Sequence, residues 1–330
     1  MTLLDQSSVA LGDDVSISGL TVAYGAAPAL RDVYLNITAG TTTALVGESG
    51  SGKSTLALAA SRLLPPGASI VSGSVRVGDT DLVALHGPPL RQARGRLAAY
   101  LPQDASVALN PVTRVGLQIA EVHQVRHGMS RREAARLARQ NLAGVGFPDP
   151  ERVARRYPHE LSGGMRQRAI IAIALAFRPR LLIADEPTTA LDVTVQAEIL
   201  GLVGRIQRQC GLTVLWITHD VSVVAEIADR VAVLYGKTIV EQADALTLFE
   251  APRHPYTQAL LRCFREGRTA APKQLLEAVK GSPPTGRLPD GCPFHTRCPE
   301  ADGDRCDTLL PEPRFLAPGH QAACHRLESL

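Results

Sequence analysis

Residues 47–54 read Gly47-Glu48-Ser49-Gly50-Ser51-Gly52-Lys53-Ser54, which fits the pattern Gly-x-x-x-x-Gly-Lys-Ser/Thr. We call this segment the phosphate loop, because its glycines let the backbone wrap around phosphates and its N–H groups point at the anion. We expect Lys53 to reach the β- and γ-phosphates of a nucleoside triphosphate and the Ser54 hydroxyl to bind Mg²⁺. The predicted nucleotide-binding residues here are Gly47, Glu48, Ser49, Gly50, Ser51, Gly52, Lys53, Ser54 and Thr55.

The sequence around the phosphate loop alternates between strand and helix patterns. A β-rich run, Thr42–Val46, precedes the loop, and a helical pattern follows it from Lys53 to Leu64, where two prolines and a glycine end it. Further patterns predict strands at Val15–Ala23, Leu181–Ala184 and Leu212–Ile217, and helices at Met165–Phe177 and Val193–Cys210. This alternation favours an α/β fold with a largely parallel sheet.

Two segments depart from this alternation. The stretch from about Asp104 to Leu161 has the pattern of a helical insert, in which Ser130 and Glu133 form a capping-box pair. Beyond about Arg265, proline and glycine become frequent and periodicity fades. We therefore predict a nucleotide-binding domain over residues 1–265, with a helical subdomain at about 104–165, and a small cysteine-bearing domain over 266–330.

An acidic pair follows the predicted buried strand Leu181–Ala184. A strand that ends in Asp185 places a carboxylate beside the loop that holds the phosphates, so we expect Asp185 to hold Mg²⁺ through water. Glu186 lies one residue further on and is suited to polarise the attacking water as a general base. Taken alone, such a pair would be solvated; its distance from the phosphate loop indicates function.

Composition excludes several classes of protein. The chain has 330 residues, enough for about two domains, and 45% of them are hydrophobic, which excludes disorder for most of its length. A net charge of +3 without a basic run argues against a nucleic-acid partner. No stretch approaches the ~18–20 apolar residues of a membrane span, and residues 1–14 lack the pattern of a secretory signal. We expect a cytosolic protein whose role at a membrane would come through partners.

Residues 161–167, Leu161-Ser162-Gly163-Gly164-Met165-Arg166-Gln167, resemble the signature motif of ATP-binding cassette (ABC) ATPases. Other motifs of that family occur in the family's order. Tyr24 is similar to the aromatic residue that stacks on adenine, Gln103 to the Q-loop glutamine, Asp192 in Ala190-Leu191-Asp192 to the D-loop aspartate and His219 to the switch histidine. The resemblance covers about residues 15–250.

This resemblance implies a mixed sheet with a RecA-like core plus a helical subdomain. It also implies that Ser162, Gly163 and Gly164, which open a helix, form a second anion site facing ATP bound to another subunit. ATP would then lie between two subunits of a head-to-tail dimer. Gln103 is implied as a catalytic residue that also contacts Mg²⁺, and His219 as the residue that positions the attacking water; Asp192 belongs to the same site.

A narrower resemblance lies downstream. Arg253-His254-Pro255-Tyr256-Thr257 and Gly291-Cys292-Pro293-Phe294-His295-Thr296-Arg297-Cys298-Pro299 are similar to segments of oligopeptide and dipeptide importers. This implies the first, D-type ATPase subunit of such an importer, peripheral on the cytoplasmic face of the membrane. The implied partners are a second ATPase, with a paralogue favoured over an identical copy, two transmembrane permeases and an extracytoplasmic substrate-binding protein.

Three alternatives remain open at this stage. The chain could serve an importer for another substrate, such as nickel chelates, although the ATPases of those importers tend to lack a long cysteine-bearing tail. It could be a soluble ABC ATPase of DNA repair or translation, which usually carries two cassettes or a long coiled-coil insertion. It could be an iron–sulfur assembly ATPase, but its cysteines lie in the segment that resembles peptide importers.

Four of the six cysteines lie near the end of the chain, spaced Cys292-x5-Cys298-x7-Cys306-x17-Cys324. Zinc sites more often use two tight pairs, which this pattern lacks, and four thiolates on long loops favour a [4Fe-4S] cluster. Zinc is the alternative, with His295, His320 or His325 as substitute ligands. The third possibility is that the thiols stay reduced and pack in a small hydrophobic domain.

Overall fold

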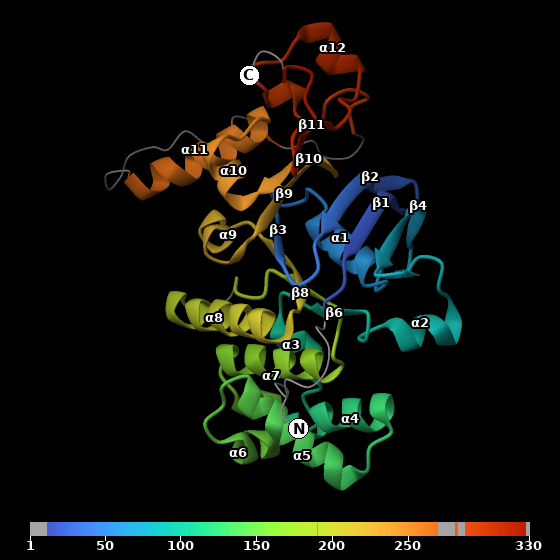
Figure 1. Cartoon of the computed structure of the whole chain (residues 1–330), viewed down its shortest axis with the longest axis vertical. Coiled ribbons are helices and arrows are strands. Elements are labelled where there is room, and N and C mark those ends of the chain that lie inside the picture. Colours follow the sequence, from blue (N-terminus) through green and yellow to red (C-terminus); the bar gives the residue numbers. More distant parts are fainter. Residues whose placement is uncertain (1–11, 190, 270–280, 283–287, 328–330) are drawn as a thin grey trace.

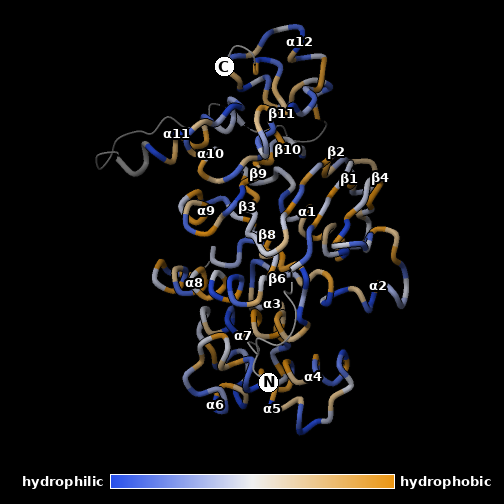
Figure 2. Tube along the Cα trace, in the orientation of Figure 1, coloured by the Kyte–Doolittle hydropathy of each residue, from blue (hydrophilic) through white to orange (hydrophobic). Residues whose placement is uncertain are grey.

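The computed structural model describes residues 12–189, 191–269, 281–282 and 288–327. Its centre holds two β-sheets, and the helical insert lies at one end (Figure 1). Residues 288–327, which we call the C-terminal segment, lie at the other end. The predicted α/β fold is therefore confirmed. In Figure 2 hydrophobic and hydrophilic residues alternate along the surface helices, as expected when one face of each helix is buried.

The smaller sheet is antiparallel, with strand order β2-β1-β4-β5. Its strands are β1 (Val15–Tyr24), β2 (Ala27–Ile37), β4 (Ala68–Val77) and β5 (Thr80–Asp81). Along the second half of β2 buried and exposed residues alternate, which is the pattern of a sheet with one face on the core. Helix α1 (Lys53–Ala60) contacts strands of both sheets. It therefore joins them into one core.

The larger sheet has strand order β11-β12-β10-β9-β3-β8-β7-β6. Five of its strands are parallel: β3 (Thr42–Val46), β6 (Ala98–Leu101), β7 (Leu181–Asp185), β8 (Thr213–Thr218) and β9 (Arg230–Tyr235). The other three continue it in antiparallel pairing: β10 (Thr238–Asp244), β11 (Arg314–Ala317) and β12 (His320–Ala322). Every residue of β3, β7 and β8 is buried, since helices cover both faces.

The insert is helical, as predicted. It contains α3 (Ala105–Ala108), α4 (Val115–His127), α5 (Arg131–Gly144), α6 (Pro150–Arg155) and the 3-10 turn η1 (Pro158–Glu160), and it packs on α7 (Gly163–Ala176). At the start of α5 the Ser130 hydroxyl accepts the Glu133 N–H at 3.3 Å, which confirms the first half of the predicted capping pair. The other described helices are α2 (Gly87–Ala93), α8 (Val193–Cys210), α9 (Val221–Ile227), α10 (Ala245–Glu250), α11 (Pro255–Thr269), η2 (His295–Arg297) and α12 (Gly303–Thr308).

One predicted helix is too long. Helix α1 ends at Ala60, not at Leu64. The Ser61 hydroxyl bonds back to the Ala57 carbonyl at 2.8 Å, and Arg62 takes a left-handed φ of 58°. The Arg62 guanidinium also donates to the Leu85 carbonyl, so a tertiary contact fixes the end of the helix.

The C-terminal segment is tied to the larger sheet. Strand β12 pairs with β10, with Ala322 opposite Glu241. An aromatic cluster of Tyr235, Tyr256 and Phe294 fills the space between β9, α11 and residues 291–299, which we call the cysteine-bearing loop. The predicted boundary between residues 265 and 266 stays a prediction. Within the described part of the chain, no helix is both long and apolar enough to cross a membrane.

Candidate functional site

The phosphate loop connects β3 to α1 and depends on two glycines. A Cβ on Gly47 would lie 2.1 Å from the Leu234 carbonyl oxygen of the neighbouring strand, closer than any real contact allows. Gly52 has φ 111°, and a Cβ there would lie 2.9 Å from the Ala29 oxygen. The close approach of β9 and β2 therefore requires glycine at both positions and fixes the shape of the loop.

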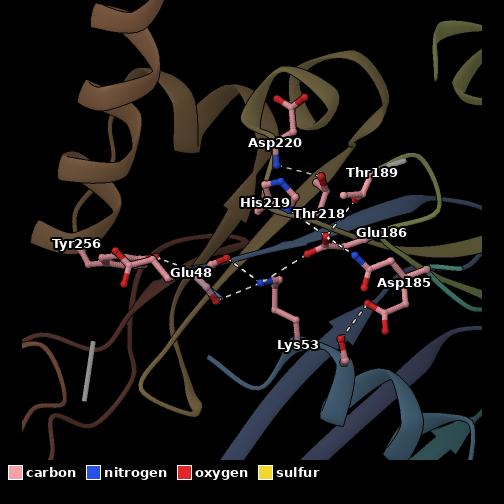
Figure 3. Close-up of polar contacts among 12 residues, drawn as sticks. Glu48, Lys53, Asp185, Glu186, Thr189, Thr218, His219, Asp220 and Tyr256 are labelled. Atoms are coloured by element: carbon pink, nitrogen blue, oxygen red, sulfur yellow. Dashed lines mark hydrogen bonds and ion pairs between the residues drawn. The ribbon is translucent and has the colours of Figure 1, made fainter. Parts of the chain in front are cut away.

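Lys53 points back into the phosphate loop. Its Nζ donates to the Gly47 carbonyl at 2.8 Å and to the Glu48 carbonyl at 3.1 Å, and it lies 3.9 Å from Glu186 Oε1 (Figure 3). The side chain is 6% exposed, and burial lowers its pKa below the usual range of lysine. A buried ammonium held by neutral carbonyls is well placed to transfer to an anion that enters the loop.

Asp185 at the end of β7 faces the start of α1. Its Oδ1 accepts the Ser54 hydroxyl at 3.2 Å and its Oδ2 accepts the Tyr100 hydroxyl at 3.0 Å. Burial raises the pKa of the Asp185 carboxyl. A hydroxyl and a carboxylate side by side are the oxygen donors that Mg²⁺ prefers, so Ser54 and Asp185 fit the predicted metal site. Sequence reasoning missed Tyr100; its position at the end of a strand beside β7 was the available signal.

Glu186 is the centre of a polar network at the ends of the parallel strands (Figure 3). Its Oε2 accepts from His219 Nδ1 at 3.0 Å, from the Thr189 hydroxyl at 3.0 Å and from Gln103 Nε2 at 3.5 Å. Glu186 itself has a left-handed φ of 46°, an uncommon conformation for a non-glycine residue that clusters at functional sites. The structure thus brings together three residues predicted from separate motifs. Thr189 was not predicted.

A cleft of about 450 Å³ opens in front of the phosphate loop. Tyr24, which is 39% exposed, lines the cleft together with Gln103 and Glu186. Lys237, which sequence reasoning did not find, also lines the cleft, and its Nζ donates to the Pro28 carbonyl at 2.6 Å. From the loop and α1, the lining includes Ser49, Gly50, Gly52, Lys53, Ser54 and Thr55. The cleft therefore collects most of the residues expected to bind a nucleotide, while Gly47, Glu48 and Ser51 of the phosphate loop are not among those that line it.

The signature segment lies apart from this cleft. The described residues that line the cleft do not include Ser162, Gly163, Gly164 or Asp192. The Ser162 hydroxyl accepts the Met165 N–H and caps α7, while Asp192 accepts the Val195 N–H at 2.9 Å and caps α8. A Cβ on Gly164 would lie 2.4 Å from Val195 Cγ1, so the two helices meet closely there. Ala190 of the D-loop segment lies outside the described residues.

The four C-terminal cysteines are free thiols in a common environment. Cys292, Cys306 and Cys324 are buried, and the Cys292 N–H donates to the Cys306 carbonyl at 2.8 Å. Burial raises the pKa of Cys292 to about 12 and that of Cys298 to about 11, and the neighbouring cysteines add smaller effects of the same sign. Burial therefore disfavours the thiolate forms of Cys292 and Cys298 in this structure.

The predicted metal site in this segment is not supported. Among the residues that the structure describes, no three His, Cys, Asp or Glu side chains form a group that could hold a metal ion. The proposed zinc substitutes are engaged elsewhere: His295 with Asp307, His320 with Glu241 and His325 with the Leu309 carbonyl. A [4Fe-4S] cluster or zinc ion at Cys292, Cys298, Cys306 and Cys324 thus has no support from the described residues.

Comparison with known proteins decides the family. A protein of Sinorhizobium fredii named "Probable peptide ABC transporter ATP-binding protein" is 47% identical over 300 residues, which are 90% of this chain and 89% of that protein. This chain belongs to the ABC transporter ATP-binding proteins. Residues 30–189 match the ABC transporter family, and residues 240–306 match the C-terminal region of oligopeptide/dipeptide transporters. Both resemblances seen in the sequence are therefore confirmed.

Other relatives are also named as ATP-binding proteins of peptide transport. The dipeptide transport ATP-binding protein DppD of Escherichia coli is 41% identical, with 94% of this chain and 96% of that protein covered. The oligopeptide transport ATP-binding protein AppD of Bacillus subtilis is 44% identical, with 91% and 92% covered. Among solved structures, a dimeric, post-hydrolysis ATP-binding cassette bound to ADP and Pi has a TM-score of 0.62 at 28% identity, covering 70% of this chain and 98% of that chain. The ABC ATPase fold is confirmed.

Proposed function

We propose that this chain is the ATP-hydrolysing, energy-coupling subunit of a membrane importer for dipeptides or oligopeptides. The observation that carries the proposal is the convergence of Lys53, Glu186 and His219 at the phosphate loop, with Glu186 Oε2 3.0 Å from His219 Nδ1. The relatives' names and the match of residues 240–306 to the C-terminal region of peptide transporters support the substrate class. They also favour peptides over nickel chelates and over a soluble ABC ATPase.

The residues of the site suggest how hydrolysis proceeds. When ATP enters, Lys53 leaves the carbonyls of the phosphate loop for the β- and γ-phosphates. Ser54, Asp185 and Gln103 would hold Mg²⁺, which offsets the charge of the phosphate oxygens. Glu186 accepts a proton from the water whose oxygen attacks the γ-phosphorus as the bond to ADP breaks, and His219 holds the γ-phosphate. Tyr24, which lines the cleft, would stack on adenine.

We infer that the second face of the ATP site comes from another subunit. Ser162, Gly163 and Gly164 open α7, a helix of 14 residues whose N-terminus is a ready anion site. They do not line the described cleft of their own chain, and a dimeric cassette is among the similar solved structures. A head-to-tail dimer would bring this segment and Asp192 to the ATP of the partner, which in the leading version is a paralogue.

The remaining partners follow from the same proposal. Two transmembrane permeases and an extracytoplasmic substrate-binding protein would complete the importer, with this chain on the cytoplasmic face of the membrane. Extraction of the tagged protein from native membranes in mild detergent tests this. Recovery of those subunits supports import, and the ligand of the binding protein names the substrate. Recovery with DNA-repair, ribosomal or iron–sulfur assembly factors would leave the ATPase intact and refute the transport role.

The hydrolysis mechanism has a direct test. Glu186→Gln removes the base and should lower ATP turnover by about 10²- to 10⁴-fold while ATP-bound dimers accumulate. Glu226→Gln on α9 changes an equally charged but exposed residue and serves as the control. Unchanged turnover in Glu186→Gln would show that another group takes the proton.

The [4Fe-4S] cluster rests on cysteine spacing alone. Iron in anaerobically purified protein, with an absorbance shoulder near ~400 nm, would support it. Protein without either signal would refute the cluster and leave the ATPase proposal untouched.

A further inference from the structure

The C-terminal segment contacts the phosphate loop through one buried ion pair. Arg297 Nη1 donates to Glu48 Oε2 at 2.7 Å and Nη2 donates to Glu48 Oε1 at 3.0 Å, so the guanidinium and the carboxylate form a two-pronged pair. The Arg297 side chain is 4% exposed and that of Glu48 is 25% exposed. The two residues are 249 positions apart in the sequence, yet they join the second residue of the phosphate loop to the cysteine-bearing loop.

Aromatic side chains hold this pair in place. Arg297 Nη1 also donates to the Tyr235 hydroxyl at 3.1 Å, and the guanidinium carbon lies 5.6 Å from the Tyr235 ring centre and 5.9 Å from that of Phe294. The Tyr256 hydroxyl accepts the Glu48 N–H at 3.1 Å. Planar stacking and a rigid fork of donors suit arginine better than lysine. Both the side chain and the backbone of Glu48 are therefore bound by residues outside the loop.

The cysteine-bearing loop fits closely against the cassette. A Cβ on Gly236, in the turn after β9, would lie 2.4 Å from Pro293 Cβ. Gly236 has φ 52°, so glycine is required there for conformation as well as for space. A loop that packs this tightly on the turn leaves little freedom for Arg297 to move away from Glu48.

The Glu48 carboxylate lies in a loop that binds phosphates, and the Arg297 guanidinium compensates its negative charge. An uncompensated negative charge on Glu48 would repel the phosphates that the loop binds. We propose that Arg297 is a positioning residue of the ATP site, which neutralises the Glu48 carboxylate and fixes that side chain against the C-terminal segment. The C-terminal segment is then part of the nucleotide site. This inference rests on the proposed binding of ATP at the phosphate loop.

The test measures binding of MgATP, as a non-hydrolysable analogue, to the full chain. Arg297→Met should weaken binding on the order of tenfold at low salt. This loss should become smaller as salt rises from about 50 to about 500 mM, because screening weakens the repulsion between Glu48 and the phosphates. Adding Glu48→Gln to Arg297→Met removes the repelling charge and should restore affinity to within about threefold of the unmodified chain. Arg305→Met removes an exposed arginine of the same segment and is the matched control.

Two results would overturn the inference. One is an affinity of Arg297→Met within about twofold of the unmodified chain, and the other is a double variant no better than Arg297→Met. If thermal unfolding shows that Arg297→Met does not fold, Arg297→Lys carries the test. It keeps the charge, so a tenfold loss in that variant would equally refute compensation. Lys53→Ala is measured in parallel: if it too binds MgATP normally, the proposed function fails, and otherwise only the inference does.

Discussion

Replacing Glu241 with glutamine tests how the C-terminal segment is attached to the sheet. Glu241 lies in β10 and is 1% exposed. Its Oε1 accepts from His320 Nε2 at 2.8 Å and from the Arg253 N–H at 2.7 Å, and its Oε2 accepts the His254 N–H at 2.9 Å. One buried carboxylate thus joins β10, β12 and the turn before α11.

The loss of stability follows from these three bonds. In Glu241→Gln one oxygen becomes an NH₂ group, which must face a hydrogen-bond donor, so at least one bond breaks and the others lose their charge. Bonds to a charged acceptor contribute about 1.5–3 kcal/mol each. Breaking a buried pair costs about 3–5 kcal/mol. We expect the free energy of unfolding to fall by about 3–5 kcal/mol, which for a chain of 330 residues corresponds to a melting temperature lower by roughly 4–7 °C.

Circular dichroism during heating and in urea measures this loss. The control is Glu198→Gln, which removes a carboxylate that pairs with Arg168 at 2.7 Å but is 53% exposed. Exposed pairs contribute about 0–1 kcal/mol, so the control should stay close to the unmodified chain. If Glu241→Gln loses no more than about 1 kcal/mol, the same as the control, the carboxylate does not anchor the segment and the reasoning is wrong.

Three further predictions follow from the described contacts. Lys53→Ala should weaken MgATP binding at least about 10²-fold in calorimetry, because two charged hydrogen bonds to phosphate are lost; a loss below tenfold contradicts this. Tyr24→Ala should weaken ATP binding about 2- to 10-fold but should not change the binding of inorganic triphosphate, since only stacking on adenine is removed. Burial lowers the pKa of His254 to about 4. The contribution of neutral His254 to the free energy of unfolding is therefore complete above about pH 6.5, and about 3 kcal/mol of it is lost as pH falls towards 4. Urea midpoints of His254→Asn should vary less with pH than those of the unmodified chain.

The sequence predicts a helix accurately where residues next to its ends fix those ends. Helix α8 spans Val193–Cys210 as predicted, because Asp192 caps its start and Gly211, with φ 60°, ends it. Helix α1 was predicted four residues too long, because its end depends on the contact between Arg62 and the Leu85 carbonyl. Propensity cannot report a partner 23 residues away.

The residues of the candidate site also fall into two groups: those that local motifs predict and those that only tertiary contacts bring to the site. Lys53, Asp185, Glu186 and His219 belong to local sequence motifs, so the sequence alone predicts them as site residues. Other residues act through contacts that spacing does not encode. Tyr100 reaches Asp185 from 85 positions away and Arg297 reaches Glu48 from 249, so only the fold brings them together.

The topology of the larger sheet explains both the site and its connection to the C-terminal segment. Parallel strands end at one edge, so β3, β7 and β8 deliver Gly47, Glu186 and His219 to the same place. Strand β9 is also parallel to β3 and lies on its other side. Its end brings Tyr235 to the same edge, where the Tyr235 hydroxyl accepts from Arg297. Because β9 and β10 are joined by a tight turn, a segment that pairs with β10 through β12 is carried to the phosphate loop. The contact between Arg297 and Glu48 is thus a consequence of strand order, because a segment added at the opposite edge, beside β6, would have β6, β7 and β8 between it and β3, the strand that enters the phosphate loop.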